Sequence, residues 1–252
     1  MTVAELETKQ ETKQETDHDI YQTSTMLALL DGLYDGVVSF AELQKHGDFG
    51  LGTFDQLNGE MIAFDSEFYH LFPDGTAHRV KPEETTPFST VTFFREDFIY
   101  TVDRPMRREE LEALLLKLFP SRNMFYAFRI DGTFREVKTR TVPHQVKPYK
   151  PFIEVTKSQP TFTFNEASGV ITGFWTPAYA QGIGVAGFHL HFINDERTGG
   201  GHVFDVVVEK CTIRICQKSN LHLVLPDTPD YLNANLSRKD LDKEIAVTEG
   251  AQ

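Results

Sequence analysis

The chain has 252 residues and a formal net charge of −12 at pH 7, and 40% of its residues are hydrophobic. This length suffices for one large domain, or for two closely packed ones, with a substantial core. The acidic balance argues against nucleic acid or an anionic membrane as a partner, because phosphate binding needs clustered Lys and Arg. We therefore expect neither nucleic acid nor a membrane as a partner.

The sequence carries no sign of a membrane span or an export signal. No apolar run approaches the roughly 20 residues that a membrane helix requires, and the N-terminus lacks the basic start and apolar core of a signal peptide. Only two cysteines are present, which agrees with a reducing compartment. We expect the protein to be cytoplasmic.

Residues 1–19 contain a polar repeat, Glu7-Thr-Lys-Gln-Glu-Thr-Lys-Gln, which offers no apolar face to a core. We expect a disordered tail here, with order beginning near Ile20. Ser39 is a suitable N-cap for a short helix from Phe40 to Lys45.

Strands are expected to dominate the next part of the chain. The runs 61–64 and 68–72 should pair as a hairpin across Asp65-Ser66. The β-rich runs 124–130 and 133–141 are separated by Asp131-Gly132, which predicts a second hairpin with a two-residue turn. Between them, leucines at 111, 114, 115 and 118 have helical spacing and predict a helix over 107–118.

Three prolines at 143, 148 and 151 mark a connection between two sheet-based halves. We place a subdomain boundary there, giving an N-terminal subdomain over 20–150 and a C-terminal one over 151–252. The second half adds the β-rich runs 161–164, 169–174 and 221–225. The predicted fold class is α+β, with two closely packed subdomains built on mixed or antiparallel sheets and few helices.

Three histidines, at 189, 191 and 202, stand out in the second half. The sequence around them reads as two apolar strands joined by a polar turn near Asp195 to Gly199. Side chains alternate along a strand, so His189 and His191 should share a face that Leu190 does not. With a turn of about four residues, His202 falls opposite His191, close enough for three imidazoles to meet at one cation.

Three imidazoles that leave a fourth position open are typical of a catalytic divalent metal. Cys211 and Cys216 are poor joint ligands, because their odd separation along a strand places them on opposite faces. Imidazole ligands suit zinc, copper, iron and nickel alike, so the spacing does not identify the metal.

Three polar residues outside the hairpin are further candidates for the site. Glu60 lies where a glycine-rich loop enters an apolar strand and could face a cleft, although a solvated strand-edge carboxylate is the simpler alternative. Arg140 lies at the end of a strand and could clamp a carboxylate, or be an ordinary surface arginine. Thr53 could contact substrate or stabilise a turn.

Taken together, these motifs resemble the α-acetolactate decarboxylase family over roughly residues 20–250. The resemblance rests on Tyr34-Asp-Gly, His46-Gly-Asp-Phe-Gly-Leu-Gly-Thr-Phe, Leu57-Asn-Gly-Glu-Met, Thr139-Arg-Thr-Val-Pro, Gly173-Phe-Trp-Thr-Pro, and Gly187-Phe-His-Leu-His-Phe with its Gly-Gly-Gly-His continuation.

The resemblance implies a zinc enzyme that converts (S)-2-acetolactate to (R)-acetoin and CO₂ on the way to butanediol. It implies His189, His191 and His202 as the metal ligands and a zinc-bound enediolate as the intermediate. In this mechanism Arg140 would orient the substrate carboxylate, and Glu60 would protonate the enediolate on one face.

The family also implies a homodimer and an active-site glutamate near the C-terminus. Glu249 is the best positional match for this catalytic residue, and Glu244 is the competing assignment. Thr53 lies in the family's Gly-Thr-Phe segment and is the candidate for substrate binding beside Arg140.

Two other functions remain open from the sequence. In a cupin-type metal oxygenase or isomerase, Glu196 would join His189 and His191 as a ligand, but no second cupin motif follows. In a non-catalytic binding module, the hairpin would hold a metal ion and Arg140 would have no role.

Overall fold

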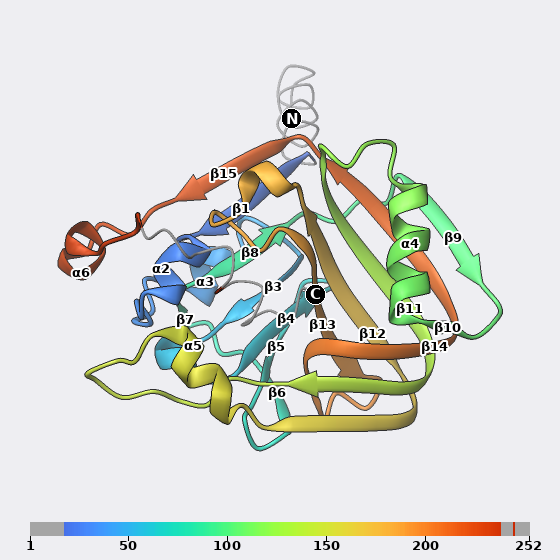
Figure 1. The fold of residues 1–252 in the computed structure, drawn as a ribbon, viewed down its shortest axis with the longest axis horizontal. Coiled ribbons are helices and arrows are strands. Elements are labelled where there is room, and N and C mark those ends of the chain that lie inside the picture. The colour runs from blue at the N-terminus through green and yellow to red at the C-terminus, as the bar shows by residue number, and fades with distance from the viewer. Residues whose placement is uncertain (1–17, 238–243, 245–252) are drawn as a thin grey trace, which may run out of the picture.

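The protein, described by a computed structural model for residues 18–237 and Glu244, is built around two large β-sheets (Figure 1). The first sheet has seven strands, and its parallel β1–β15 pair makes it mixed. Its order is β15 (Asn220–Val224), β1 (Asp19–Thr23), β8 (Ser89–Thr92), β3 (Phe49–Thr53), β4 (Glu60–Phe64), β5 (Glu67–Leu71) and β6 (Ala77–Arg79).

The second sheet is antiparallel and contains the three longest strands of the described chain (Figure 1). Its order is β10 (Met106–Arg107), β14 (Gly200–Lys218), β11 (Phe125–Arg140), β12 (Thr161–Thr176) and β13 (Gly187–Asn194), with β9 (Phe98–Val102) also on β14. Because β13 pairs with the start of β14 as well, strands β14, β11, β12 and β13 form a closed circuit.

Short elements complete the described fold. A two-stranded sheet pairs β2 (Val38–Ser39) with β7 (Thr85–Thr86). The α-helices are α2 (Met26–Leu30), α3 (Phe40–Leu43), α4 (Arg108–Leu118), α5 (Phe152–Val155) and α6 (Pro229–Asn233), and the 3₁₀ turns are η1 (Asp55–Leu57), η2 (Thr156–Ser158) and η3 (Ala178–Ala180). Helices are few, so the predicted α+β class is confirmed.

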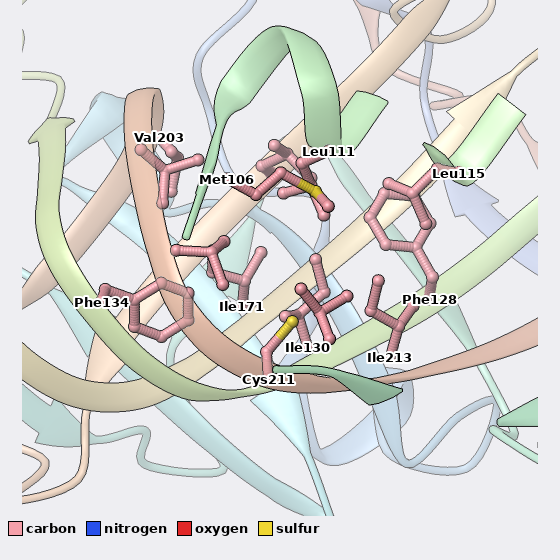
Figure 2. Close-up of a cluster of buried hydrophobic side chains, with 14 of the residues drawn as sticks. Met106, Leu111, Leu115, Phe128, Ile130, Phe134, Ile171, Val203, Cys211 and Ile213 are labelled. Atoms are coloured by element: carbon pink, nitrogen blue, oxygen red, sulfur yellow. The ribbon is translucent and has the colours of Figure 1, made fainter. Parts of the chain in front are cut away.

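Alternation of side chains along the strands divides the hydrophobic core into layers. Phe128, Ile171 and Phe192 face α4 in a core that Figure 2 shows around Leu111 and Leu115. Their neighbours Ala127, Val170 and Ile193 point the other way and pack against the first sheet, in a cluster with Phe49, Leu51 and Ile62. The two sheets therefore pack face to face, and the second face of the six-stranded sheet is covered by α4.

Several expected elements are confirmed. The β4–β5 hairpin turns at Asp65-Ser66, and Ser39 caps α3 by accepting a hydrogen bond from the Glu42 amide at 3.3 Å. The expected helix forms as α4; its Leu111 and Leu115 are buried, and its Leu114 and Leu118 pack against the same core. Cys211 and Cys216 are buried in different core layers, on opposite faces of β14 as predicted.

The hairpin predicted across Asp131-Gly132 is wrong, because both runs belong to the single strand β11. A type I′ turn needs a positive φ at both central residues, and neither residue has one. The Asp131 carboxylate instead accepts a hydrogen bond from Arg129 Nε at 2.9 Å and pairs with Arg214 on β14. Gly132 is needed for close strand contact, since a Cβ there would lie 2.3 Å from the Lys210 carbonyl oxygen.

Both sheets take strands from either side of residue 150. The first sheet contains β15 from the C-terminal part, whereas the second contains β9, β10 and β11 from before the proline-rich connection. The sheet to which a strand belongs does not show whether a part of the chain folds by itself. The division into subdomains over residues 20–150 and 151–252 therefore stays a prediction. Of the predicted tail, residues 1–17 lie outside the described chain, and β1 begins at Asp19.

Within residues 18–237 and at Glu244, no helix combines the length and apolar character that a bilayer crossing requires.

We expect Gly132→Ala to lower the free energy of unfolding by about 1–3 kcal/mol, because the added methyl group overlaps the backbone of β14. Urea denaturation measures this change. Gly184→Ala is the matched control, since its Cβ would meet its nearest atom at an ordinary 3.5 Å. Equal stability of the two variants would contradict the close packing inferred for β11.

Candidate active site

The three histidines meet on the β13–β14 hairpin, as the sequence predicted. His191 lies directly opposite His202 in the register, and His189 shares a strand face with His191. The turn between the strands closes with a 3.0 Å hydrogen bond from the Asn194 amide to the Gly199 carbonyl. One ligand nitrogen of each ring lies within 4.8 Å of the others, so the three histidines could bind a metal ion.

A hydrogen bond to the other sheet orients the central histidine. His191 Nδ1 lies 2.7 Å from the Met61 carbonyl oxygen on β4. A carbonyl oxygen only accepts, so Nδ1 carries the hydrogen and Nε2 presents its lone pair to the cluster. That Nε2 atom is buried and has no hydrogen-bond partner in the described structure. A metal ion would satisfy it, in the pattern of a ligand histidine fixed through its second nitrogen.

Burial keeps the imidazoles of His189 and His191 neutral. It lowers the pKa of His191 to about 4, and the hydrogen bond to Met61 opposes the shift only in part. Burial also lowers the pKa of His189 well below its usual value, with further lowering from His191 and Arg140. Neutral imidazole is the form that binds metals, so the donor set fits a divalent cation.

The first sheet brings a carboxylate to the histidines. Glu60 begins β4 and is 8% exposed, and its Oε2 lies 3.7 Å from His191 Nε2. Thr53 ends β3 opposite Glu60 in the register, and its hydroxyl donates to the Gly59 carbonyl oxygen at 2.7 Å. The Thr53 side chain thus holds the turn that leads into Glu60.

Arg140 reaches the same place from the end of β11. It lies opposite His202 in the β11–β14 register, so strand pairing places it beside a candidate ligand. Arg140, Glu60, Thr53, His189 and His202 line one pocket. The candidate residues Thr53, Glu60, Arg140 and the three histidines are therefore brought together, although they come from five strands of two sheets.

The pocket also has an apolar wall that the sequence analysis did not identify. It is formed by Met26, Leu29, Leu57, Phe88, Val142 and Phe152, with Gln159 as a further polar residue. The pocket encloses about 400 Å³ of space free of protein atoms, including its opening to solvent. No local pattern marks these residues, because α2, α5 and the turn after β3 converge only in the folded chain. Such a wall suits the alkyl groups of a small substrate.

The chain that forms this site also matches a known protein family. A family model described as Alpha-acetolactate decarboxylase matches residues 20–238. The chain belongs to the α-acetolactate decarboxylase family.

Relatives across this family cover nearly the whole chain. The Alpha-acetolactate decarboxylase of Bacillus subtilis (strain 168) is 53% identical over 232 residues, which are 92% of this chain and 91% of the relative. That of Klebsiella aerogenes is 47% identical over 233 residues, 92% of this chain and 90% of the relative.

Solved structures of acetolactate decarboxylase relatives share the fold. The crystal structure of the Bacillus subtilis strain 168 protein superposes with a TM-score of 0.91 at 53% identity, covering 92% of this chain and 100% of that one. A Staphylococcus aureus protein of unknown function, described as similar to alpha-acetolactate decarboxylase, gives 0.89 at 31% identity with the same coverage.

Of the two C-terminal candidate glutamates, only Glu244 belongs to the described residues. Glu249 lies outside the described residues, and Glu244 is half-buried. Glu196, the ligand that a cupin-type site would need, is exposed in the β13–β14 turn. Within the described chain, the metal-ligand cluster at the hairpin comprises the three histidines and not Glu196.

We expect the metal-free protein to lose stability as the pH falls from about 6.5 toward 4. In this window the unfolded chain protonates His191 while the folded chain, with its lowered pKa, does not. At about 1.4 kcal/mol per pKa unit, His191 contributes on the order of 3 kcal/mol. Urea unfolding of the chelator-treated protein across this range measures the loss.

The His191→Gln variant should show a smaller loss of stability over the same pH range. His78→Gln, which removes an exposed imidazole, is the control and should behave like the unmodified protein. A pH dependence unchanged in His191→Gln would contradict the role of the buried ring.

Proposed function

We propose that the protein decarboxylates (S)-2-acetolactate to (R)-acetoin and CO₂, with a divalent metal ion held by His189, His191 and His202. The observation that carries the proposal is the pocket in which Glu60 and Arg140 face this histidine cluster. The names of the Bacillus subtilis and Klebsiella aerogenes relatives support the substrate.

Zinc is the metal that we propose for the cluster. Three neutral imidazole nitrogens with room for substrate fit a catalytic zinc site, and the described chain brings no cysteine to it. When bound, zinc supplies Lewis acidity, which draws electron density from the oxygen atoms of the substrate as the carbon–carbon bond breaks.

Arg140 is proposed to bind the carboxylate that leaves. Its planar guanidinium can make two parallel hydrogen bonds to a carboxylate, which fixes the direction of the bond to be broken. Placed beside His202 by strand pairing, it would hold that carboxylate next to the metal ligands. As CO₂ departs, the electron pair of the broken bond stays with the remaining carbon–oxygen framework.

Glu60 is proposed to deliver the proton that completes acetoin. It enters the pocket from the first sheet, whereas the histidines and Arg140 come from the second. A proton delivered from this one side would add to one face of the product carbon and set its configuration. Solvent would then return a proton to the carboxylate for the next cycle.

The remaining assignments follow the family resemblance. We propose Glu249 as the second catalytic glutamate, with Glu244 as its alternative, and Thr53 as a substrate-binding residue beside Arg140. A homodimer, a cytoplasmic location and a place in butanediol formation remain predictions.

We expect Glu60→Gln to keep the metal but to lower kcat by about 10²- to 10⁴-fold, because the amide cannot deliver the proton. Steady-state acetoin formation and metal analysis of the same preparation measure the two effects. Glu67→Gln, on the neighbouring strand with its carboxylate paired to Arg79 at 3.0 Å, is the matched control. Full activity in Glu60→Gln would rule out this role.

We expect His189→Ala to lose both metal and activity, since two imidazoles hold zinc weakly. Metal content per chain, measured by mass spectrometry, should fall from about one to near zero. His78→Ala removes an exposed histidine and should retain the metal. Stoichiometric metal in His189→Ala would show that the cluster is not the binding site.

The proposed reaction itself is tested with racemic 2-acetolactate. Purified protein should release (R)-acetoin, lose activity after chelation and regain it when zinc is added back. No turnover from fully metal-loaded protein would refute the proposal and favour a binding module or a cupin-type reaction.

A further inference from the structure

The turn that leads into Glu60 is held in an unfavourable backbone conformation. Gln56, Leu57 and Gly59 all have positive φ values, of 59°, 54° and 93°. For the two residues with a Cβ this conformation costs free energy and persists only where the surroundings enforce it. Gly59 cannot be replaced at this position without strain, because a Cβ would lie 2.3 Å from the Leu71 carbonyl oxygen.

Hydrogen bonds from three directions enforce this turn. The Thr53 hydroxyl donates to the Gly59 carbonyl oxygen at 2.7 Å, and the Gly59 amide donates to the Val142 carbonyl oxygen at 3.0 Å. The third comes from His70, whose Nε2 contacts the Asn58 carbonyl oxygen. Thr53 and Val142 line the pocket, whereas His70 does not.

His70 acts from the far side of the first sheet. It pairs with Met61 in the β4–β5 register, so its side chain shares the Met61 face and not the face of Glu60. The ring is 3% exposed and lies stacked between Phe54 and Phe72, with centroid separations of 3.5 and 3.7 Å. These two rings prevent the imidazole from tilting.

The second nitrogen of this imidazole is also fixed. Nδ1 lies 3.1 Å from the Glu84 Oε1 atom, while Glu84 Oε2 accepts a 2.6 Å hydrogen bond from the Lys81 amide. The Asn58 carbonyl can only accept, so His70 Nε2 must carry a hydrogen. The His70 ring is therefore held by a polar contact at each nitrogen and by an aromatic ring on each face. A side chain that only filled space in the core would not need the two polar contacts.

We propose that His70 is a positioning residue for the reaction, which holds the Gln56–Gly59 turn and thereby fixes the Glu60 carboxylate against the histidine cluster. The inference rests on the proposed function, because it assumes that Glu60 delivers the proton. Asn58, which His70 holds, is two residues from Glu60, whose Oε2 lies 3.7 Å from His191 Nε2. Misplacement of a reacting group by about 1 Å can cost about 100-fold in rate.

A double-mutant cycle on the zinc-loaded enzyme tests the proposal. His70→Phe keeps a stacked ring but removes the donor to Asn58, whereas His70→Gln keeps an amide hydrogen that can replace it. Both are made in the unmodified chain and in Glu60→Gln, and kcat and KM for acetolactate are measured with metal content and circular dichroism. In the Glu60→Gln background, the reaction rate is measured under single-turnover conditions at high enzyme concentration.

We expect His70→Phe to lower kcat by about 10- to 100-fold while KM changes less than about twofold. His70→Gln should recover most of the rate. In the Glu60→Gln background, His70→Phe should change the rate by less than about twofold, because the group that it positions is already lost.

Three results would overturn the proposal. The first is an unchanged kcat in His70→Phe, and the second is a kcat in His70→Gln that stays as low as in His70→Phe. The third is the same relative decrease in rate in both backgrounds, which would mean that His70 has only a structural role. Full activity of Glu60→Gln is a different failure, which removes the proposed function of Glu60 and this inference with it. If His70→Phe does not fold, Glu84→Ala replaces it in the cycle, with the same criteria.

Discussion

The hydrogen bond from His191 Nδ1 to the Met61 carbonyl oxygen links the two sheets at the candidate active site. It crosses from β13 to β4, and its acceptor is the residue directly after Glu60. One contact therefore sets the tautomer of a candidate metal ligand and the distance from that ligand to the candidate acid. The packing of Ala127, Val170 and Ile193 against the first sheet maintains this contact, because it fixes the separation of the sheets.

The site has an energetic cost that the metal would offset. Burying His189 and His191 lowers their pKa values and leaves the Nε2 lone pair of His191 without a hydrogen bond in the described structure. An unsatisfied buried polar atom destabilises a folded protein by about 1–3 kcal/mol. A bound metal ion would satisfy that atom, so the burial that destabilises the metal-free protein also keeps His189 and His191 in the neutral form that binds a cation.

Sequence reasoning succeeded where the determining interactions are local. The period of two along β13 and the four-residue turn were enough to place His191 opposite His202. It failed at Asp131-Gly132, because the ion pairs of Asp131 and the close approach of β14 to Gly132 are tertiary contacts. The apolar wall of the pocket and the role of His70 were missed for the same reason, since α2, α5 and the far face of β5 carry no local signal. The convergence of Glu60 with the histidines was expected from family resemblance and not from spacing.

The three candidate ligands lie on one hairpin of the second sheet, whereas Glu60 and Thr53 come from the first. Under the proposed function, metal binding would depend on one sheet and proton transfer on the other, so mutations could change them separately. Substitutions in the layer between the sheets can shift the carboxylate without disturbing the hairpin, so evolution or protein engineering could retune stereochemistry, or change the reaction, on a metal site inherited intact. Conversely, because the three histidines lie on one continuous hairpin, that hairpin could be transferred to another antiparallel sheet by protein engineering.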